Sequence, residues 1–180
     1  GDLVVCIATP SDGIESGTAI PSNSLIITNS PPSLTGATIS PTVGGKLTTF
    51  SCIHEGASDP DDGDSANLVF AYSWSIDGAL VVGADSESFT PGSSSATEVT
   101  LTCSVTPYDL QSYGEASISG PALITNLAPS VESVSLNAAD GGLYCVPQGL
   151  SDPDGDSVSP LFSWLINGQI VASEHEAFLP

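Results

Sequence analysis

The chain has 180 residues, and the 40% that are hydrophobic are enough to fill the cores of one or two small domains. Its 21 Asp and Glu residues stand against a single Lys or Arg, Lys46, which gives a formal net charge of -20. A protein so poor in cations cannot neutralise phosphates, so binding to nucleic acid or to anionic membrane surfaces is disfavoured and divalent cations are more natural partners.

Four cysteines are present without any CxxC or Cys/His spacing, which disfavours zinc, thiol-redox and haem chemistry. Disulfides are the better account, and they indicate an oxidising compartment such as the extracellular space or a periplasm. No apolar run approaches the length of a membrane span, so we expect no direct membrane insertion. The residues therefore favour a secreted or cell-surface protein.

The beginning of the chain recurs later in the sequence. Leu3 to Leu34 can be laid without a gap on Thr100 to Val131, at a constant offset of 97 that places Cys6 on Cys103. The motif "IITNSPPS" falls on "LITNLAPS" in this alignment. Each motif carries a proline that cannot continue a strand ladder, so both are predicted to mark domain junctions.

A second alignment, with small insertions, relates the middle of the chain to its end. It sets "CIHEGASDPDDGDS" on "CVPQGLSDPDGDS", "YSWSIDGALVV" on "FSWLINGQIVA", and "ESFTP" on "EAFLP". The two alignments define a unit that is complete only once, over residues 30–126. Residues 1–29 are predicted to supply the C-terminal strands of such a unit, and residues 127–180 the N-terminal strands of a further one.

Within the unit, apolar residues alternate with Ser and Thr, as from Tyr72 to Ile76 and from Val99 to Val105, which is typical of half-buried strands. Asp77-Gly78 and Asn167-Gly168 are flanked by apolar residues and predict two-residue type I′ hairpins. No stretch has the 3.6-residue period of a helix, so the fold class is predicted to be all-β.

Cys52, Trp74 and Cys103 follow one another in the order found in sandwiches where a disulfide joins two sheets beside a buried Trp. We therefore predict an immunoglobulin-like (Ig-like) β-sandwich with a Cys52–Cys103 bridge, and we place Trp74 and Trp164 in cores. The chain as a whole is predicted to hold Ig-like repeats in series, one complete domain flanked by two complementary half-domains.

These motifs resemble the tandem PKD-like and Ig-like repeats of large bacterial extracellular and surface proteins, which are related in style to cadherin-like modules. The carriers are the "SDPDDGDS" and "SDPDGDS" loops, the "YSWSIDG" and "FSWLING" strands, "VTLTCSVTPYD" with "LVVCIATPSDG", and the "TNSPPS" and "TNLAPS" linkers. Such repeats usually form spacers, stalks, adhesin shafts or fibres, and the resemblance implies that role here.

The acidic loops place carboxylates at alternate positions around a Gly turn, which suits a hard cation such as calcium. In an Ig-type sandwich, two loops and the incoming linker meet at one end, which would gather the ligands near a domain joint. The alternative is an Asx-rich turn in which short carboxylates bind their own backbone amides without a metal. The candidate calcium ligands are Asn29, Asp59, Asp61, Asp64 and Asp109 at one joint and Asn126, Asp152, Asp154 and Asp156 at the other.

Cys6 and Cys145 each lack a partner within their own half-domain, so each is expected to pair with a cysteine of another chain or of adjoining sequence. Two arrangements remain open. Neighbouring repeats of a longer chain complete both halves, or further copies of the protein bind head to tail and build an open filament.

The function predicted from the sequence is a structural extracellular fibre, stalk or adhesin shaft, in which calcium at the joints is expected to add stiffness. No catalytic residues are assigned, because His54 and His175 have no partnered Ser or Cys at a recognisable spacing. The alternatives are an adhesion module that binds carbohydrate or a receptor, and a spacer attached to a catalytic domain outside this chain.

Overall fold

A computed structural model describes the whole chain apart from residues 62, 140 and 172–175 and the side chain of residue 64. The described residues are almost entirely strands and loops, and their only helical element is a 3-10 turn, η1 (Asp64–Asn67). The fold is therefore all-β, as predicted. His175 lies outside the described residues, whereas His54 stacks on Phe70 with the ring centroids 3.8 Å apart.

The strands fall into three parts of the chain, which we call the N-terminal segment (residues 1–29), the central unit (residues 30–126) and the C-terminal segment (residues 127–180). The N-terminal segment contains β1 (Leu3–Val4), β2 (Ile7–Ala8), β3 (Ile20–Pro21) and β4 (Leu25–Ile26). The central unit contains β5 (Gly36–Ser40), β6 (Val43–Gly44), β7 (Phe50–Glu55), β8 (Val69–Ile76), β9 (Ala79–Leu80), β10 (Ser88–Phe89), β11 (Val99–Tyr108), β12 (Ser117–Ile118) and β13 (Ala122–Ile124). The C-terminal segment contains β14 (Ser133–Ala139), β15 (Gly142–Gln148), β16 (Leu165–Ile166), β17 (Gln169–Ile170) and β18 (Phe178–Leu179).

Two sheets pack against each other in the central unit. One has the strand order β10-β7-β5, and the other has the order β6-β13-β11-β8-β9 with β12 also paired to β11. Alternate residues of each strand point into the space between the sheets. The buried core consists of Ala37, Ile39, Phe50, Cys52, Trp74, Leu101, Cys103, Val105, Ala122 and Ile124.

The expected disulfide joins the two sheets of this core. Cys52 on β7 and Cys103 on β11 are bonded, with their Cα atoms 6.0 Å apart, within the usual range for a bridge. Trp74 on β8 lies fully buried beside the bridge, and its indole N–H donates to the carbonyl oxygen of Ser86 at 2.8 Å. The buried Trp therefore keeps its polar atom satisfied.

Both predicted hairpin turns are confirmed by their backbone angles. Asp77 and Gly78 have φ values of 47° and 79°, and Asn167 and Gly168 have values of 51° and 80°. A type I′ turn needs positive φ at both central positions, which is why Asx-Gly pairs occur there. The Asp77 carboxylate also accepts hydrogen bonds from the backbone N–H and the hydroxyl of Thr100, and these lower its pKa below the ordinary value of 3.8.

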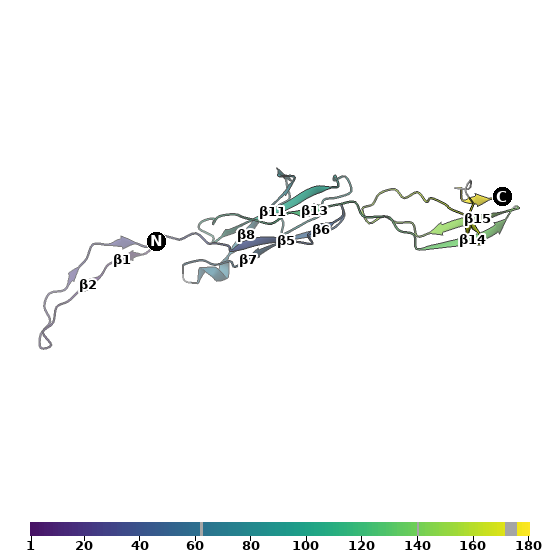
Figure 1. Ribbon diagram of the computed structural model, residues 1–180. Helices are drawn as coiled ribbons and strands as arrows, with labels where there is room; N and C mark the ends of the chain where they lie inside the picture. Colours follow the sequence, from purple (N-terminus) through teal and green to yellow (C-terminus); the bar gives the residue numbers. More distant parts are fainter. Residues whose placement is uncertain (62, 140, 172–175) are drawn as a thin grey trace.

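The N-terminal and C-terminal segments extend from opposite ends of the central unit (Figure 1). The N-terminal segment is a narrow ribbon in which β1 pairs with β4 and β2 with β3, and its residues up to position 28 are exposed. The C-terminal segment has a β14-β15-β18 sheet and a separate β16-β17 hairpin. Among the described residues, no helix is both long and apolar enough to cross a membrane.

The strand register of the N-terminal segment reproduces that of the central unit at the sequence offset of 97. The pairs Leu3–Ile26, Val4–Leu25, Ile7–Pro21 and Ala8–Ile20 correspond to Thr100–Leu123, Leu101–Ala122, Ser104–Ile118 and Val105–Ser117. The ribbon therefore has the same hydrogen-bonded ladder as β11 with β13 and β12, although no second sheet formed by the described residues covers it.

One part of the sequence alignment is wrong by one residue. The alignment set "EAFLP" on "ESFTP", which matches Phe178 to Phe89, but Phe178 pairs with Tyr144 as Ser88 pairs with Ser51. The cause is visible at the two tryptophans, because Trp164 donates to the carbonyl of Glu176 as Trp74 donates to that of Ser86. Each acceptor lies 12 residues after its Trp, so the backbone spacing is the same in the two copies. The Glu and Phe side chains that guided the alignment stand at positions that differ by one residue.

Candidate functional site

The first acidic loop precedes β8 and is tied to the linker that enters the central unit. Asp59 accepts a hydrogen bond from the N–H of Asp61 at 2.7 Å, and its own N–H donates to the hydroxyl of Ser65. The carboxylate of Asp61 accepts the N–H of Ser30 at 2.8 Å. The predicted proximity of this loop to the linker is therefore present, and part of the loop is an Asx turn that binds backbone amides.

Asp109, in the loop after β11, binds the same linker. Its buried carboxylate accepts the side-chain amide of Asn29 at 2.8 Å and the backbone N–H groups of Gln111 and Ser112. Burial alone would raise the pKa of this carboxyl, but the hydrogen bonds from Asn29, Ser112 and Gln111 outweigh it and lower the pKa from 3.8 to about 2. The linker therefore binds the ionised form of the Asp109 carboxyl group.

This contact predicts an acid-sensitive joint. The pKa of Asp109 is lower in the folded protein than its ordinary value of 3.8, so its stabilising effect is complete above about pH 4 and is lost as the pH falls toward 2. Thermal unfolding followed from pH 6 to pH 2 should show this loss in the wild-type protein and a smaller one in Asp109→Asn. A carboxyl titration of Asp109 by NMR with a midpoint near 3.8 would contradict the assignment.

The second acidic loop lies in the C-terminal segment and has its three carboxylates close together. One ligand atom from each of Asp152, Asp154 and Asp156 falls within 4.8 Å of the others, a spacing at which they could hold a metal ion. Asp154 is fully buried, and its two oxygens accept the backbone N–H groups of Lys46 at 2.7 Å and Leu127 at 2.6 Å. The loop therefore binds both the central unit and the linker that leaves it.

Lys46, the only Lys or Arg residue in the sequence, lies at this joint. Its ammonium donates to both oxygens of Asp156, at 2.7 and 2.9 Å, and the residue is only 7% exposed. The hydrogen bond that the ammonium donates to Asp156 raises the pKa of Lys46 above 10.5, so the lysine stays charged. A Cβ on the neighbouring Gly45 would collide with the Asp154 carboxylate, which explains why the turn before Lys46 needs a glycine.

Sequence reasoning noted Lys46 but gave it no role. The available signal was its isolation: a lone cation in a chain with 21 acidic residues is expected to find a carboxylate partner when it is buried. The partner itself could not be predicted, because Lys46 and Asp156 are 110 residues apart and meet only across the joint. The Lys46 ammonium thus binds Asp156, one of the predicted calcium ligands.

The remaining predicted ligands divide between the two joints. Asn126 is exposed and its side chain donates to the carbonyl of Leu127, so the backbone of this linker, rather than its Asn side chain, binds the acidic loop. The side chain of Asp64 lies outside the described residues. Among those described, the second loop gives the only group of three acidic, His or Cys side chains with metal-like spacing.

The two loops differ in how well they fit a calcium ion. In the second loop, backbone amides bind both oxygens of Asp154 and the Lys46 ammonium binds both oxygens of Asp156. In the first loop, one carboxylate oxygen of Asp59 is buried and has no hydrogen-bond partner among the described residues. An orphan buried carboxylate oxygen is the kind of group that a cation satisfies, so the first loop fits calcium better.

The bonds of Asp154 give a direct prediction for the second joint. In Asp154→Asn the amide NH₂ must face one of two backbone N–H donors, which leaves a buried donor without an acceptor and costs about 1.5–3 kcal/mol. We expect hydrogen exchange at the amides of Lys46 and Leu127 to quicken at least about tenfold. The exposed Asp85→Asn is the matched control, and equal exchange rates in the two variants would contradict the role of Asp154.

Comparison of the chain with protein-family models, with curated proteins and with solved structures finds no match. A functional assignment therefore depends on the contacts described above. They combine a disulfide-bonded central unit, polar contacts of Asp109, Asp154 and Asp156 that tie each part of the chain to the next, and two segments with exposed apolar side chains.

Proposed function

We propose that the protein is a structural component of an extracellular fibre, stalk or adhesin shaft, in which Ig-like β-sandwich domains follow one another in series. The central unit has the properties that such a sandwich requires: two antiparallel-rich sheets, a disulfide between them and a buried Trp beside it. The resemblance to PKD-like and Ig-like repeats of bacterial surface proteins supports the same role.

The observation that carries the proposal is the repetition of the joint. Asp61 accepts the N–H of Ser30, and Asp154 accepts the N–H of Leu127, which lies 97 residues after Ser30. The serine bridges next to each joint repeat in the same way, between Ser33 and Ser58 and between Ser130 and Ser151. Joints of one geometry between successive domains produce a regular, extended assembly, as a shaft requires.

The chemistry of the chain fits an extracellular setting. A Cys52–Cys103 bridge is stable in an oxidising environment, and a net charge of -20 keeps an elongated protein dispersed. The partners of such a shaft are further copies of the same chain bound head to tail or adjoining repeats of a longer chain. Catalysis has no place in this function.

Electron microscopy of the native material, combined with denaturing gels with and without reductant, tests the function. We expect thin, unbranched filaments with a beaded outline, because each disulfide-bonded sandwich is one compact bead on a line. Dispersed compact particles under the same conditions, at all protein concentrations, would reject the shaft.

Calcium is proposed to bind the first acidic loop and to stiffen its joint. The orphan oxygen of Asp59 supports this site, and extracellular calcium modules bind with dissociation constants of about 10⁻⁴–10⁻³ M. At 10 mM calcium, an ion bound with a constant of about 1 mM stabilises the folded state by about 1.4 kcal/mol. Calcium should therefore raise the midpoint temperature of thermal unfolding in the wild-type protein and in Asp152→Asn, but not in Asp59→Asn.

Magnesium at the same ionic strength is the control for charge screening. An equal shift with magnesium, or an unchanged calcium shift in Asp59→Asn, would leave the first loop as an Asx turn without a metal.

A further inference from the structure

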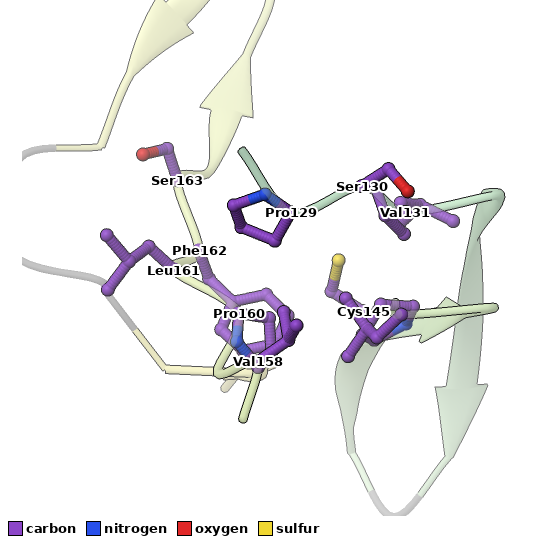
Figure 2. A pocket seen from close by; sticks show the side chains of 12 residues that line it. Pro129, Ser130, Val131, Cys145, Val158, Pro160, Leu161, Phe162 and Ser163 are labelled. Carbon is purple, nitrogen blue, oxygen red and sulfur yellow. The ribbon is translucent and has the colours of Figure 1, made fainter. Parts of the chain in front are cut away.

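The C-terminal segment has an open apolar groove. The equivalent face of the central unit is closed. The groove has a volume of about 330 Å³ and its lining includes Val134, Cys145 and Val158. The Cys145 sulfur points into the space bordered by Pro129 and Pro160 (Figure 2). In the central unit the corresponding sulfur, that of Cys52, is bonded to Cys103 and fully buried.

Side chains on both segments are exposed where their central counterparts are buried. Val4 is 48% exposed and Leu25 is 69% exposed, whereas Leu101 and Ala122, at the offset of 97, are 0% and 1% exposed. On the other segment Leu136 is 62% exposed against 6% for its counterpart Ile39. The N-terminal segment thus presents the inner face of one sheet, and the C-terminal segment presents the inner face of the opposite sheet.

A strand is also incomplete in the C-terminal segment. In the central unit β8 runs over eight residues, because β11 pairs with it along its whole length. The matching stretch, residues 159–166, is strand only at Leu165–Ile166. No strand among the described residues of the C-terminal segment corresponds to β11, whereas β1 and β2 correspond to it by sequence and by register.

We propose that the N-terminal segment of a second copy fills this groove and completes the C-terminal segment as a sandwich. The proposal rests on the proposed shaft and names its partner. The register follows from the pairs Leu101–Ile76, Cys103–Trp74 and Val105–Tyr72 of the central unit. The intermolecular pairs are then Val4 with Ile166, Cys6 with Trp164, and Ala8 with Phe162.

The occupant is a second copy because of where the two segments lie. The central unit stands between them, and they extend away from its opposite ends (Figure 1). The bonds that join them to the central unit are those of Asn29 with Asp109 at one end and of Lys46 with Asp154 and Asp156 at the other. Each copy offers one N-terminal segment and one groove, so successive copies form an open chain that does not close on itself.

Cys6 and Cys145 then occupy the places of Cys103 and Cys52, and both are free thiols in the single chain. With glutathione disulfide as oxidant, the Cys6 thiolate attacks one glutathione sulfur and displaces the other as a thiolate. The Cys145 thiolate then attacks the Cys6 sulfur and releases the second glutathione. Two electrons pass to glutathione disulfide, and the two cysteine protons end on the two glutathione thiols.

The test uses Cys6→Ala and Cys145→Ala variants of the 180-residue chain in a glutathione redox buffer, analysed on non-reducing denaturing gels. The wild-type chain should form a ladder of covalent oligomers. Each variant alone should stay monomeric, and an equimolar mixture of the two should stop at a dimer, linked through Cys6 and Cys145 by mass spectrometry. Dimers of either variant alone, or no link in the mixture, would overturn the proposal.

Two substitutions on adjacent residues test the register independently of the cysteines. Val4→Asp places a charge at the position of buried Leu101 and should weaken association at least about tenfold. Leu3→Asp places the same charge at the position of exposed Thr100 and should change association by less than about twofold. If sedimentation experiments show an equal loss of association in the two variants, the assignment of Val4 to the inner face and Leu3 to the outer face is contradicted.

The experiments distinguish a failure of this proposal from a failure of the proposed function. Filaments that persist in a Cys6→Ala, Val4→Asp chain would remove the assigned partner and leave the shaft in place. Native filaments that dissolve under reduction to one very long polypeptide would show that adjoining repeats fill the groove instead of a second copy. A Cys6–Cys145 link in compact, closed particles would retain the partner and reject the shaft.

Discussion

Replacing both Cys52 and Cys103 by alanine is expected to lower the free energy of unfolding of the central unit by about 4 kcal/mol. The bridge spans 51 residues, so its loss frees a long loop in the unfolded chain, and the two buried sulfurs leave a gap between the sheets. Urea unfolding followed by circular dichroism measures the change from the shift in midpoint.

The matched control is the double variant Cys6→Ala, Cys145→Ala, measured at a concentration where the chain is monomeric. Its thiols are free, and the stability of the central unit should be unchanged within about 0.5 kcal/mol. A loss below about 1 kcal/mol in the Cys52, Cys103 variant would mean that the bridge does not hold the two sheets together.

Trp74→Ala should destabilise the central unit by about 3–5 kcal/mol, an effect as large as loss of the disulfide. The side chain is fully buried, its ring centroid lies 5.4 Å from that of Phe89, and its N–H is bonded to the carbonyl of Ser86. Alanine leaves a cavity between the sheets and an acceptor without its donor.

Val82→Ala is the control for this substitution, because Val82 lies on the same part of the chain and is 92% exposed. Its midpoint in urea should stay close to that of the wild-type protein. Comparable decreases in the free energy of unfolding in the two variants would show that Trp74 lies at the edge of the core and not at its centre.

The features that the sequence predicted well depend on local patterns. The Asp77-Gly78 and Asn167-Gly168 turns need positive φ, and few residue pairs adopt it at low cost. The pairing of Cys52 with Cys103 is predicted from the Cys-Trp-Cys order of Ig-like sandwiches. The burial of Trp74 is predicted from period-two alternation, which fixes the face on which each side chain lies. These are consequences of backbone geometry within one unit.

The features that the sequence missed depend on contacts between units. The ion pair of Lys46 with Asp156 and the bonds of Asp154 to Lys46 and Leu127 form only when the C-terminal segment docks on the central unit. The short β16 has the same origin, because residues 159–166 have strand composition, but among the described strands only β17 pairs with this stretch, at Leu165–Ile166. Alternation predicts a strand, and a partner is needed to form it.

The acidic loops show why residue type alone left two interpretations open. Carboxylates at alternate positions serve calcium or backbone amides equally well, so the pattern alone does not choose between these uses. Asp154 accepts two backbone amides and Asp156 accepts the Lys46 ammonium, whereas one buried oxygen of Asp59 has no partner among the described residues. The difference follows from which residue of the neighbouring unit faces each loop, and no pattern within the loop records it.

A structure of the assembled protein at side-chain resolution tests most directly whether the two uncovered segments are halves of one sandwich. The account predicts that residues 159–166 form a continuous strand paired with β1 and β2 of a neighbouring copy, with Cys6 bonded to Cys145 and Val4 buried. A neighbouring copy bound through any other surface, with Val4 and Leu136 still exposed to solvent, would contradict it.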